Sequence, residues 1–352
     1  MRLFKKLTLV YFGLLMLGTA CRSDLPKPKP NQVYLPTSSK NNVYIVNEGM
    51  FNTGNGAISH YNALTGEVVE DVYEKVNGKS IGNICQSMCV VDSVGYIVVN
   101  NSQKIVIVSL PSFKKLGEIN NLYSPRYFLP ISKDKAYVTD LYSNSIAVID
   151  LNTNTKISQI SCNGSTEELI LFNNKVYVTN TRTDKLYIID ANSDVLEDSI
   201  AIGFCSSSLR LDKENKIWVY CTGDYDKKIN ASIYQVDPAN KKVLQKFPLA
   251  TPLNTWDRLD INGGRDTLYF LNNGVFQLPI AETQLPKIPF IASAGRSFYG
   301  LGINPLNGEV YVSDAIDYAQ RGMIYRYKNG GVKAELLSSF KASVIPSDFI
   351  FY

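Results

Sequence analysis

One short strand-like phrase recurs seven times along this chain, and its spacing limits the fold more than any other feature. Each copy sets an aromatic residue among aliphatic ones and most end on a polar residue; the aromatic residues are Tyr44, Tyr96, Tyr137, Tyr177, Trp218, Tyr269 and Tyr311. Successive members lie 52, 41, 40, 41, 51 and 42 residues apart. A repeat of about 40 residues is typical of the four-stranded blade of a β-propeller. The sequence therefore predicts an all-β, seven-bladed propeller.

The residues around each aromatic position supply the other strands of a blade. In the third repeat, strand-like segments cover residues 128–131, 136–140, 145–150 and 156–160, and short polar turns separate them. Such runs joined by tight turns predict four antiparallel strands with hairpin connections. Because the seven aromatic residues occupy equivalent positions, we expect them to pack between blades rather than to contact a ligand.

The two ends of the repeat region predict how the ring closes. The first copy, at Tyr44, has no strand before it, whereas residues 346–352 form a strand-like segment with no copy after it. Together they would make one complete blade and remove a pair of exposed sheet edges. We expect the C-terminal strand to complete the first blade.

The N-terminus carries an export signal. Arg2, Lys5 and Lys6 precede an apolar run from Leu7 to Leu17, and small residues lead to Cys21. This arrangement resembles a bacterial lipoprotein signal; the alternatives are an ordinary cleaved signal and an uncleaved anchor. We predict a signal peptide at 1–20, lipidation of Cys21, a flexible Pro-rich tether over 21–41, and the propeller over 42–352.

The charge and residue inventory disfavours several classes of function. The net charge is +4 without a run of five like charges, so we expect no nucleic-acid surface. His60, the only histidine, falls inside a predicted strand, which leaves no Ser-His-Asp or Cys-His pair in the loops. There is no CxxC motif. We therefore expect no catalytic residue and no metal site, and a binding protein rather than an enzyme.

Acidic loop residues leave one enzymatic alternative open. Propeller lactonases and related lyases resemble this chain in architecture and use metal-binding carboxylates or a loop histidine. Carboxylates are available at Asp140, Asp224, Asp226, Asp314 and Asp317. We favour the interpretation that these residues form turns, because Asp side chains bond the backbone of their own loops.

We predict the binding site on the face where the loops after each aromatic strand meet the loops before each first strand. Three long segments, 48–56, 223–228 and 315–322, fall on this face, and long loops that share a face are typical of a binding site. Large aromatic, arginine and aspartate side chains in these loops suit a large, partly polar ligand; the alternative is that about half of them only fill the channel or pack loops. The candidates are Phe51, Tyr123, Arg126, Tyr127, Tyr142, Arg182, Phe204, Tyr225, Trp256, Arg296, Phe298, Tyr299, Asp317 and Tyr318.

One disulfide is predicted within a blade. A hairpin at Lys213-Glu214 would place Cys205 nearly opposite Cys221 on neighbouring strands. The alternative is that both are buried free thiols, which are common in protein cores.

The repeated phrase also carries a family resemblance. Tyr177-Val178-Thr179-Asn180, and nearly so 137–140, resembles the YVTN-type (YncE-like) β-propellers. The opening segment 43–51 and the late segment 311–318, with Gly322 and Tyr325, are similar to BtuG-type surface lipoproteins. The likeness covers residues 42–352.

The BtuG-type resemblance implies a function. Such proteins face the exterior from the outer membrane, capture cobalamin or related corrinoids, and pass them to a TonB-dependent outer-membrane transporter. By this resemblance the corrinoid is a bound ligand rather than a catalytic cofactor, and the membrane is contacted only through the lipid anchor. The alternative is a surface propeller that binds a protein or a glycan and no small cofactor. A metal-dependent lactonase or lyase is a third hypothesis.

Overall fold

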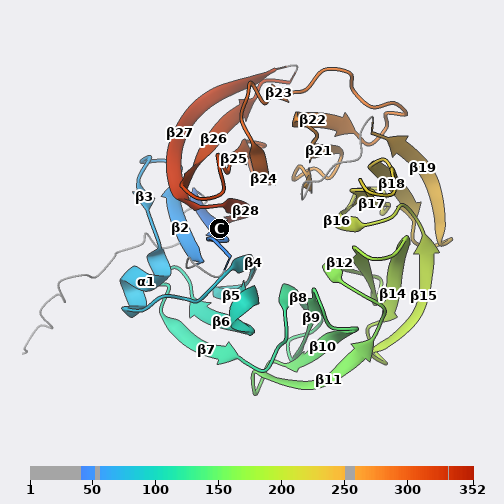
Figure 1. The fold of residues 1–352 in the computed structure, drawn as a ribbon, viewed down its shortest axis with the longest axis horizontal. Helices are drawn as coiled ribbons and strands as arrows, with labels where there is room; N and C mark the ends of the chain where they lie inside the picture. Colours follow the sequence, from blue (N-terminus) through green and yellow to red (C-terminus); the bar gives the residue numbers. More distant parts are fainter. Residues whose placement is uncertain (1–40, 52–55, 250–257, 332) are drawn as a thin grey trace, which may run out of the picture. The chain divides into compact units, whose positions relative to one another are not determined.

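The computed structural model describes residues 41–51, 56–249, 258–331 and 333–352. In this part of the chain, seven four-stranded antiparallel sheets surround a central axis (Figure 1), so the predicted seven-bladed propeller is confirmed. The predicted signal at 1–20, Cys21, the tether up to residue 40 and Trp256 lie outside the described residues.

In six of the described blades the strands follow the chain order from the axis outwards, whereas in the first blade the innermost strand is the last one of the chain (Figure 1). The first blade contains β28 (Pro346–Phe351), β1 (Asn42–Asn47), β2 (Ala57–Asn62) and β3 (Val68–Val69). The second contains β4 (Cys85–Val91), β5 (Val94–Val99), β6 (Lys104–Ser109) and β7 (Lys115–Ile119). The third contains β8 (Pro125–Pro130), β9 (Lys135–Asp140), β10 (Ser145–Asp150) and β11 (Thr155–Ser161).

The other four blades repeat this order. They are β12 (Thr166–Phe172), β13 (Lys175–Asn180), β14 (Lys185–Asp190) and β15 (Val195–Ala201); then β16 (Ser206–Leu211), β17 (Ile217–Cys221), β18 (Ser232–Asp237) and β19 (Lys242–Pro248). β20 (Leu259–Ile261), β21 (Thr267–Leu271), β22 (Gly274–Pro279) and β23 (Ile291–Ala292) form the sixth. β24 (Phe298–Ile303), β25 (Val310–Asp314), β26 (Arg321–Asn329) and β27 (Ala334–Val344) form the seventh.

The two ends of the repeat region meet in the first blade, as predicted. Strand β28 pairs antiparallel with β1, and the register sets Val43 opposite Phe351 and Ile45 opposite Phe349. The innermost strand of this blade therefore comes from the end of the chain, while its other three come from the beginning. The pairing closes the ring of sheets without a covalent bond, and β28 also contacts β24 of the seventh blade.

The recurring aromatic residues pack between blades, which confirms their structural role. They lie on the second strand of each blade, and Tyr44, Tyr137, Trp218, Tyr269 and Tyr311 are fully buried. Tyr137, for example, joins a cluster with Val176 and Tyr187 of the next blade. Each aromatic ring thus fills the space between two sheets, where its large apolar area stabilises the ring of blades.

The polar end of the repeated phrase has a separate structural role. In the third blade, the Thr139 hydroxyl accepts a hydrogen bond from the Tyr127 backbone N–H at 2.9 Å. Asp140 accepts hydrogen bonds from the backbone N–H groups of Tyr142 and Ser143 in the following loop. Ser313 and Asp314 bond the backbone in the same way in the seventh blade. Thr/Ser therefore secures the inner strand, and Asn/Asp secures the loop.

A short helix that the sequence analysis did not predict follows the first blade. The six-residue helix α1 (Val72–Asn77) begins after Asp71, whose side chain caps it, and ends at Gly78, which has a φ of 72°. Val72 and Tyr73 are buried against the blade. The long first interval of the repeat therefore contains this helix as well as the 48–56 loop. No helix among the described residues is long and apolar enough to cross a membrane.

Candidate functional site

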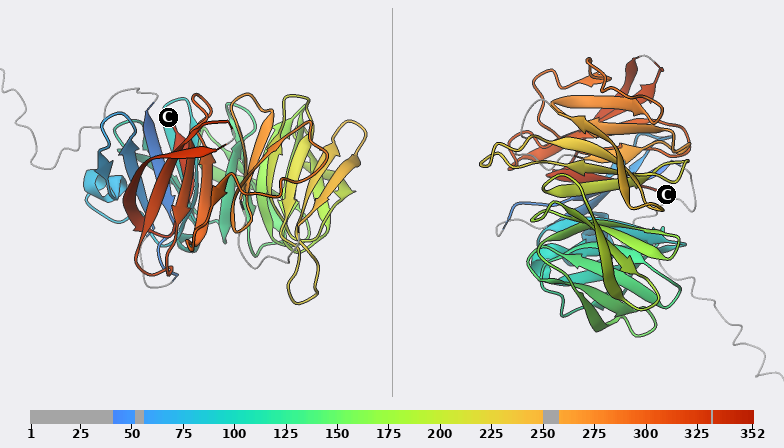
Figure 2. Two further views of the ribbon diagram at one scale, coloured as in Figure 1. Left: turned by 90° about the horizontal axis from the view of Figure 1, so that it is seen from above. Right: turned by 90° about the vertical axis from the view of Figure 1, so that its right-hand side faces the viewer.

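The inner strands share an irregularity at the end where they begin. We call the side of the ring where all inner strands begin the loop face; Figure 2 shows the strands running between this side and the opposite one. The pairing of the inner strand shifts register there in six blades, at Cys85/Ser87, Pro125/Phe128, Thr166/Leu169, Ser206/Ser208, Phe298/Leu301 and, in the first blade, opposite Val46/Asn47. Such bulges re-aim side chains.

Because of the bulges, consecutive residues line the same cavity, which lies at the loop-face end of the propeller axis. In a regular strand, neighbouring side chains point to opposite faces of the sheet. Here Arg126 and Tyr127 both line the cavity, and so do Ser207 and Ser208. The cavity has a volume of about 290 Å³. A ring of short strands thereby presents more polar side chains to its centre than a regular pleat allows.

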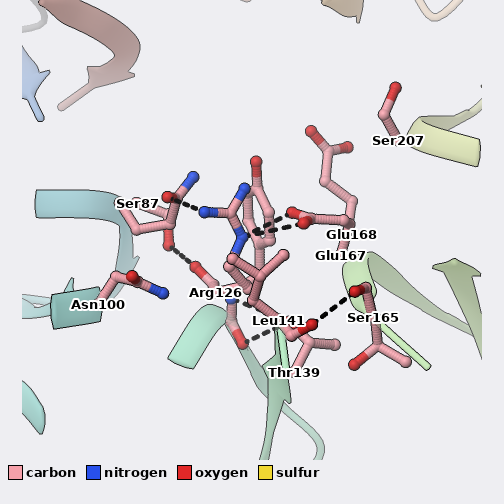
Figure 3. Close-up of polar contacts among 12 residues, drawn as sticks. Ser87, Asn100, Arg126, Thr139, Leu141, Ser165, Glu167, Glu168 and Ser207 are labelled. Carbon is pink, nitrogen blue, oxygen red and sulfur yellow. Dashed lines mark hydrogen bonds and ion pairs between the residues drawn. The ribbon is translucent and has the colours of Figure 1, made fainter. Parts of the chain in front are cut away.

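A buried ion pair forms one wall of this central cavity. The Arg126 guanidinium Nε donates to both carboxylate oxygens of Glu167, at 3.0 and 2.9 Å, and Figure 3 shows the two side chains facing each other. Arg126 also donates to the Gln86 side-chain oxygen. Burial raises the pKa of the Glu167 carboxyl, although the nearby guanidinium opposes this effect. The three residues come from three successive blades and hold their inner strands together.

A second arginine links the next blades. Arg210 Nη1 donates to Glu168 at 2.5 Å, and Arg210 Nε donates to Asp260 at 2.9 Å. Asp260 in turn accepts a hydrogen bond from the Ile303 backbone N–H at 2.7 Å. These contacts connect the fourth, fifth, sixth and seventh blades around the axis, so the channel is fixed by charged side chains on successive inner strands.

Two tyrosines hold the other charged groups of the cavity. Arg258 Nη1 donates to the Tyr127 hydroxyl at 2.9 Å, which connects the sixth blade with the third. The Tyr299 hydroxyl lies 3.1 Å from each carboxylate oxygen of Glu48 and donates to them. Burial raises the pKa of the Glu48 carboxyl, and the Arg258 charge opposes this effect.

The structure distributes the predicted site residues over several places on the loop face. Phe51, Arg126, Tyr127, Tyr142 and Tyr299 line the central cavity. Arg182 and Phe204 line a separate, open hollow of about 950 Å³, and Tyr123 lines a third of about 360 Å³.

The other described candidates lie in loop-face segments, except Phe298, which begins β24. The Arg296 guanidinium stacks 4.4 Å from the centre of the Tyr325 ring, and Phe298 packs on the same ring at 6.5 Å. Tyr318 packs edge-on against Tyr299. Tyr225 is 60% exposed. The predicted set is therefore a collection of neighbouring surfaces, of which the central cavity gathers five members.

The sequence analysis missed three of the four charged residues that line the central cavity, and several of its polar ones. Glu48, Gln86, Glu167, Ser207 and Arg258 line the cavity but were not among the predicted residues. A signal for most of them exists in the repeat. The inner strands can be aligned on one buried apolar position, which is occupied by Met88, Phe128, Leu169, Leu209 and Leu301. The residues two places earlier are then Gln86, Arg126, Glu167, Ser207 and Tyr299.

Comparison with known proteins identifies the family. A family model described as "Domain of unknown function (DUF5074)" matches residues 41–351. The chain belongs to the DUF5074 family. A search of curated proteins gives no match to this DUF5074 chain.

Solved structures share the fold of this DUF5074 chain at low sequence identity. A quinonprotein alcohol dehydrogenase-like protein of Bacteroides thetaiotaomicron is 16% identical with a TM-score of 0.70, over 89% of this chain and 78% of its own. A Lactobacillus plantarum protein is 12% identical with a TM-score of 0.67, over 89% and 99%. A putative 6-phosphogluconolactonase of Bacteroides fragilis is 14% identical with a TM-score of 0.64, over 90% and 99%. At these identities the likeness shows the fold alone.

The acidic loop residues of the DUF5074 propeller form turns. Asp140, Asp224, Asp314 and Asp317 each accept hydrogen bonds from backbone N–H groups within two or three residues. Asp224 also pairs with Lys227 at 2.8 Å. The turn-forming interpretation is confirmed for these four residues. Among the described residues, no three His, Cys, Asp or Glu side chains are grouped so that they could hold a metal ion.

His60 lies in the blade body, as expected. The side chain is 2% exposed, and its Nε2 lies 2.9 Å from the Asn42 side-chain oxygen. Burial lowers the pKa of the imidazole to about 4. The ring centroid lies 5.3 Å from that of Tyr44, and His60 does not line the central cavity, so its role is structural.

The predicted disulfide between Cys205 and Cys221 is wrong for this structure, in which both are free thiols. The register of β16 and β17 sets Ser206, not Cys205, opposite Cys221. Cys205 lies just before the strand with a left-handed φ of 60°, where the bulge begins. Because burial raises the pKa of both thiols, neither is activated as a nucleophile.

Proposed function

We propose that this DUF5074 propeller is a capture protein that binds cobalamin or a related corrinoid on its loop face. The observation that carries the proposal is the placement of exposed aromatic side chains. Among the described residues, five aromatic side chains are strongly exposed, and all five belong to loop-face segments: Phe51, Tyr123, Tyr142, Tyr225 and Tyr318. Exposed aromatic groups gathered on one face are typical of a binding surface.

The size of the central cavity favours a ligand that lies across its mouth. A volume of about 290 Å³ is at the lower end for pockets that enclose a drug-sized molecule. A large macrocycle would therefore rest on Phe51 and Tyr142 at the rim, which are 68% and 59% exposed. Aromatic rings offer broad apolar contact to such a ring, while hydroxyl and guanidinium groups bond its polar arms.

We also propose that the protein acts at the cell surface. An acylated Cys21 would hold the protein on the outer membrane, facing the exterior, and residues 22–41 would serve as a tether. A TonB-dependent transporter of the cobalamin type would receive the ligand. Support for this part comes from the signal-like N-terminus and from the resemblance to BtuG-type lipoproteins. We propose that the protein acts by binding, without catalysis.

Size-exclusion chromatography tests the proposal directly. The detergent-solubilised protein is mixed with cyanocobalamin at micromolar concentration, and the visible absorbance of the corrin ring is followed. Co-elution of this absorbance with the protein is the expected result. Elution of all the corrinoid at its free position would contradict the proposal.

A second candidate function is binding of a protein or glycan partner. The observation that favours it is the spread of exposed aromatic groups, because Tyr123 lines a hollow separate from the central cavity. Retention on immobilised glycans or on a surface protein, without co-elution of cyanocobalamin, would support this candidate.

A further inference from the structure

Two residues that line the central cavity each carry a polar atom without a partner in the described part of the chain. The Ser207 hydroxyl and the Arg258 Nε are buried, and neither forms a hydrogen bond with a described residue. Both residues line the central cavity, and the Ser207 side chain is 8% exposed. Figure 3 shows Ser207 at the start of its strand, beyond Glu167 and Glu168. Buried polar groups are normally paired, so two orphans beside one cavity indicate a place where a ligand supplies the missing bonds.

The same cavity is lined by a positive and a negative charge that attract each other without forming an ion pair. Arg126 is neutralised directly by Glu167. Arg258 and Glu48 line the cavity as well, but they form no ion pair with each other or with another described residue. Each is bonded instead by a tyrosine hydroxyl, Arg258 by Tyr127 and Glu48 by Tyr299.

The tyrosine hydroxyls do not cancel these charges, although Arg258 and Glu48 attract each other and Asp348 also attracts Arg258. Burial raises the pKa of Tyr127 to about 12 and that of Tyr299 well above its ordinary value, so both hydroxyls are neutral. A neutral hydroxyl fixes the position of a guanidinium or a carboxylate but leaves its charge available. The Glu48 backbone is also fixed, since its N–H donates to the Ile345 carbonyl at 2.9 Å. The two charges are therefore held in place on a fixed scaffold, facing a common space.

The volume of the central cavity limits the size of the ligand that it can enclose. About 290 Å³ corresponds to the liquid volume of roughly ten water molecules. A molecule with on the order of ten non-hydrogen atoms fills that space. Free amino acids and the smallest dipeptides have this size, and at neutral pH they carry one carboxylate and one ammonium group.

We propose that the central cavity binds a small zwitterion, of amino acid or dipeptide size, with its carboxylate at Arg258 and Ser207 and its ammonium group at Glu48. The guanidinium Nε and the hydroxyl supply donors for the carboxylate, and Glu48 accepts from the ammonium group. A simple anion would satisfy Arg258 but would meet the like charge of Glu48. This inference goes beyond corrinoid capture, because it assigns a ligand to the cavity itself rather than to the aromatic rim.

Thermal unfolding of the full-length protein in detergent provides the test. The common amino acids and glycylglycine are screened at millimolar concentration for a rise in the unfolding midpoint. For every hit, the N-acetyl derivative lacks the ammonium group and the C-terminal amide lacks the carboxylate. We expect at least one zwitterion to raise the midpoint and both derivatives to lose the effect. No rise with any zwitterion, or an equal rise with the acetylated form, would overturn the proposal.

Three variants connect the effect with the cavity. Calorimetric titration with the best zwitterion should show at least about tenfold weaker binding for Arg258→Gln and for Ser207→Ala. Ser207→Ala removes a single hydroxyl that forms no hydrogen bond with any described residue, so it keeps the test valid if Arg258→Gln fails to fold. Arg182→Gln, in the neighbouring hollow, is the matched control and should bind normally. Unchanged affinity in Ser207→Ala and in any folded Arg258→Gln protein would refute the assignment. Cyanocobalamin co-elution is measured separately, so failure of corrinoid capture is distinguishable from failure of this site.

Discussion

The guanidinium of Arg126 and the carboxylate of Glu167 lie 2.9 Å apart in the centre of the propeller, although 41 residues separate them in the chain. Both side chains are almost fully buried, with 7% and 2% exposure. The separation is about one blade length, so equivalent positions on neighbouring inner strands meet at the axis. The pair therefore joins the inner strands of two separate sheets, those of the third and fourth blades.

Removing one partner of this pair should be costly. Glu167→Ala leaves the Arg126 charge buried and unpaired, and we expect the free energy of unfolding to fall by about 3–5 kcal/mol in urea denaturation. Replacing both residues in Arg126→Met/Glu167→Leu should restore most of the loss, because two apolar groups need no counter-charge. A single variant as stable as the wild type would contradict this account.

The C-terminal strand should be essential for folding. Deleting residues 346–352 removes the inner strand of the first blade, so we expect loss of cooperative unfolding by circular dichroism. Phe349→Ala tests the same contact more gently; Phe349 is 6% exposed, and we expect a cost of about 3–5 kcal/mol. Leu337→Ala on the outer strand β27 is the control, since Leu337 is 41% exposed and should change stability by at most about 0.5 kcal/mol.

Aromatic side chains on the rim should determine corrinoid affinity. We expect Phe51→Ala and Tyr142→Ala each to weaken cyanocobalamin binding about tenfold, measured by titration of the corrin absorbance, because each loses a broad stacking contact. Leu306→Ala is the matched control: Leu306 is 65% exposed but lies between β24 and β25, on the side opposite the loop face. Equal weakening by the control variant would show that the effect is not local.

The threonine of the repeated phrase should be needed for its hydroxyl rather than its shape. In Thr139→Val the Tyr127 backbone N–H loses its acceptor inside the bulge, and we expect a loss of about 1–3 kcal/mol in unfolding free energy. Thr139→Ser keeps the acceptor and should retain most of the stability. If valine is tolerated as well as serine, the hydroxyl does not stabilise the bulge.

Protonation of His60 should lower the free energy of unfolding in weak acid. Its folded-state pKa of about 4 lies below the ordinary 6.5, so the unfolded chain binds the proton first as the pH falls. Stability is therefore complete above pH 6.5 and is lost towards pH 4, by up to about 3 kcal/mol in total. Buried carboxyl groups titrate in the same range, so the measurement is the difference between wild type and His60→Gln in urea denaturation. An equal pH dependence of the two proteins would disprove the contribution of His60.

Much of the fold could be predicted from the sequence because the repeat expresses local requirements. Each blade has an aromatic residue that packs between sheets, followed by residues that hydrogen-bond the backbone. These residue types recur with the blade period, for example at Tyr137, Thr139 and Asp140. The unpaired strand at the C-terminus and the missing strand before Tyr44 likewise specified the closure. The helix α1 escaped prediction because six residues are too few to show a helical period.

The binding surface was only partly visible in the sequence, because its chemistry depends on tertiary structure. Loop residues such as Phe51 and Tyr142 could be assigned to the correct face from strand order alone. The sequence could not show which charged groups lie close to one another. Glu48, Arg258 and Tyr127 come from the first, sixth and third blades, and they come together only when the ring closes. The alternation of a regular strand also sends neighbours to opposite faces, whereas the bulges bring both Ser207 and Ser208 to the cavity. The local periodicity of the sequence therefore determined the ring of blades. Which polar groups lie next to one another at the axis depends on the closed tertiary structure.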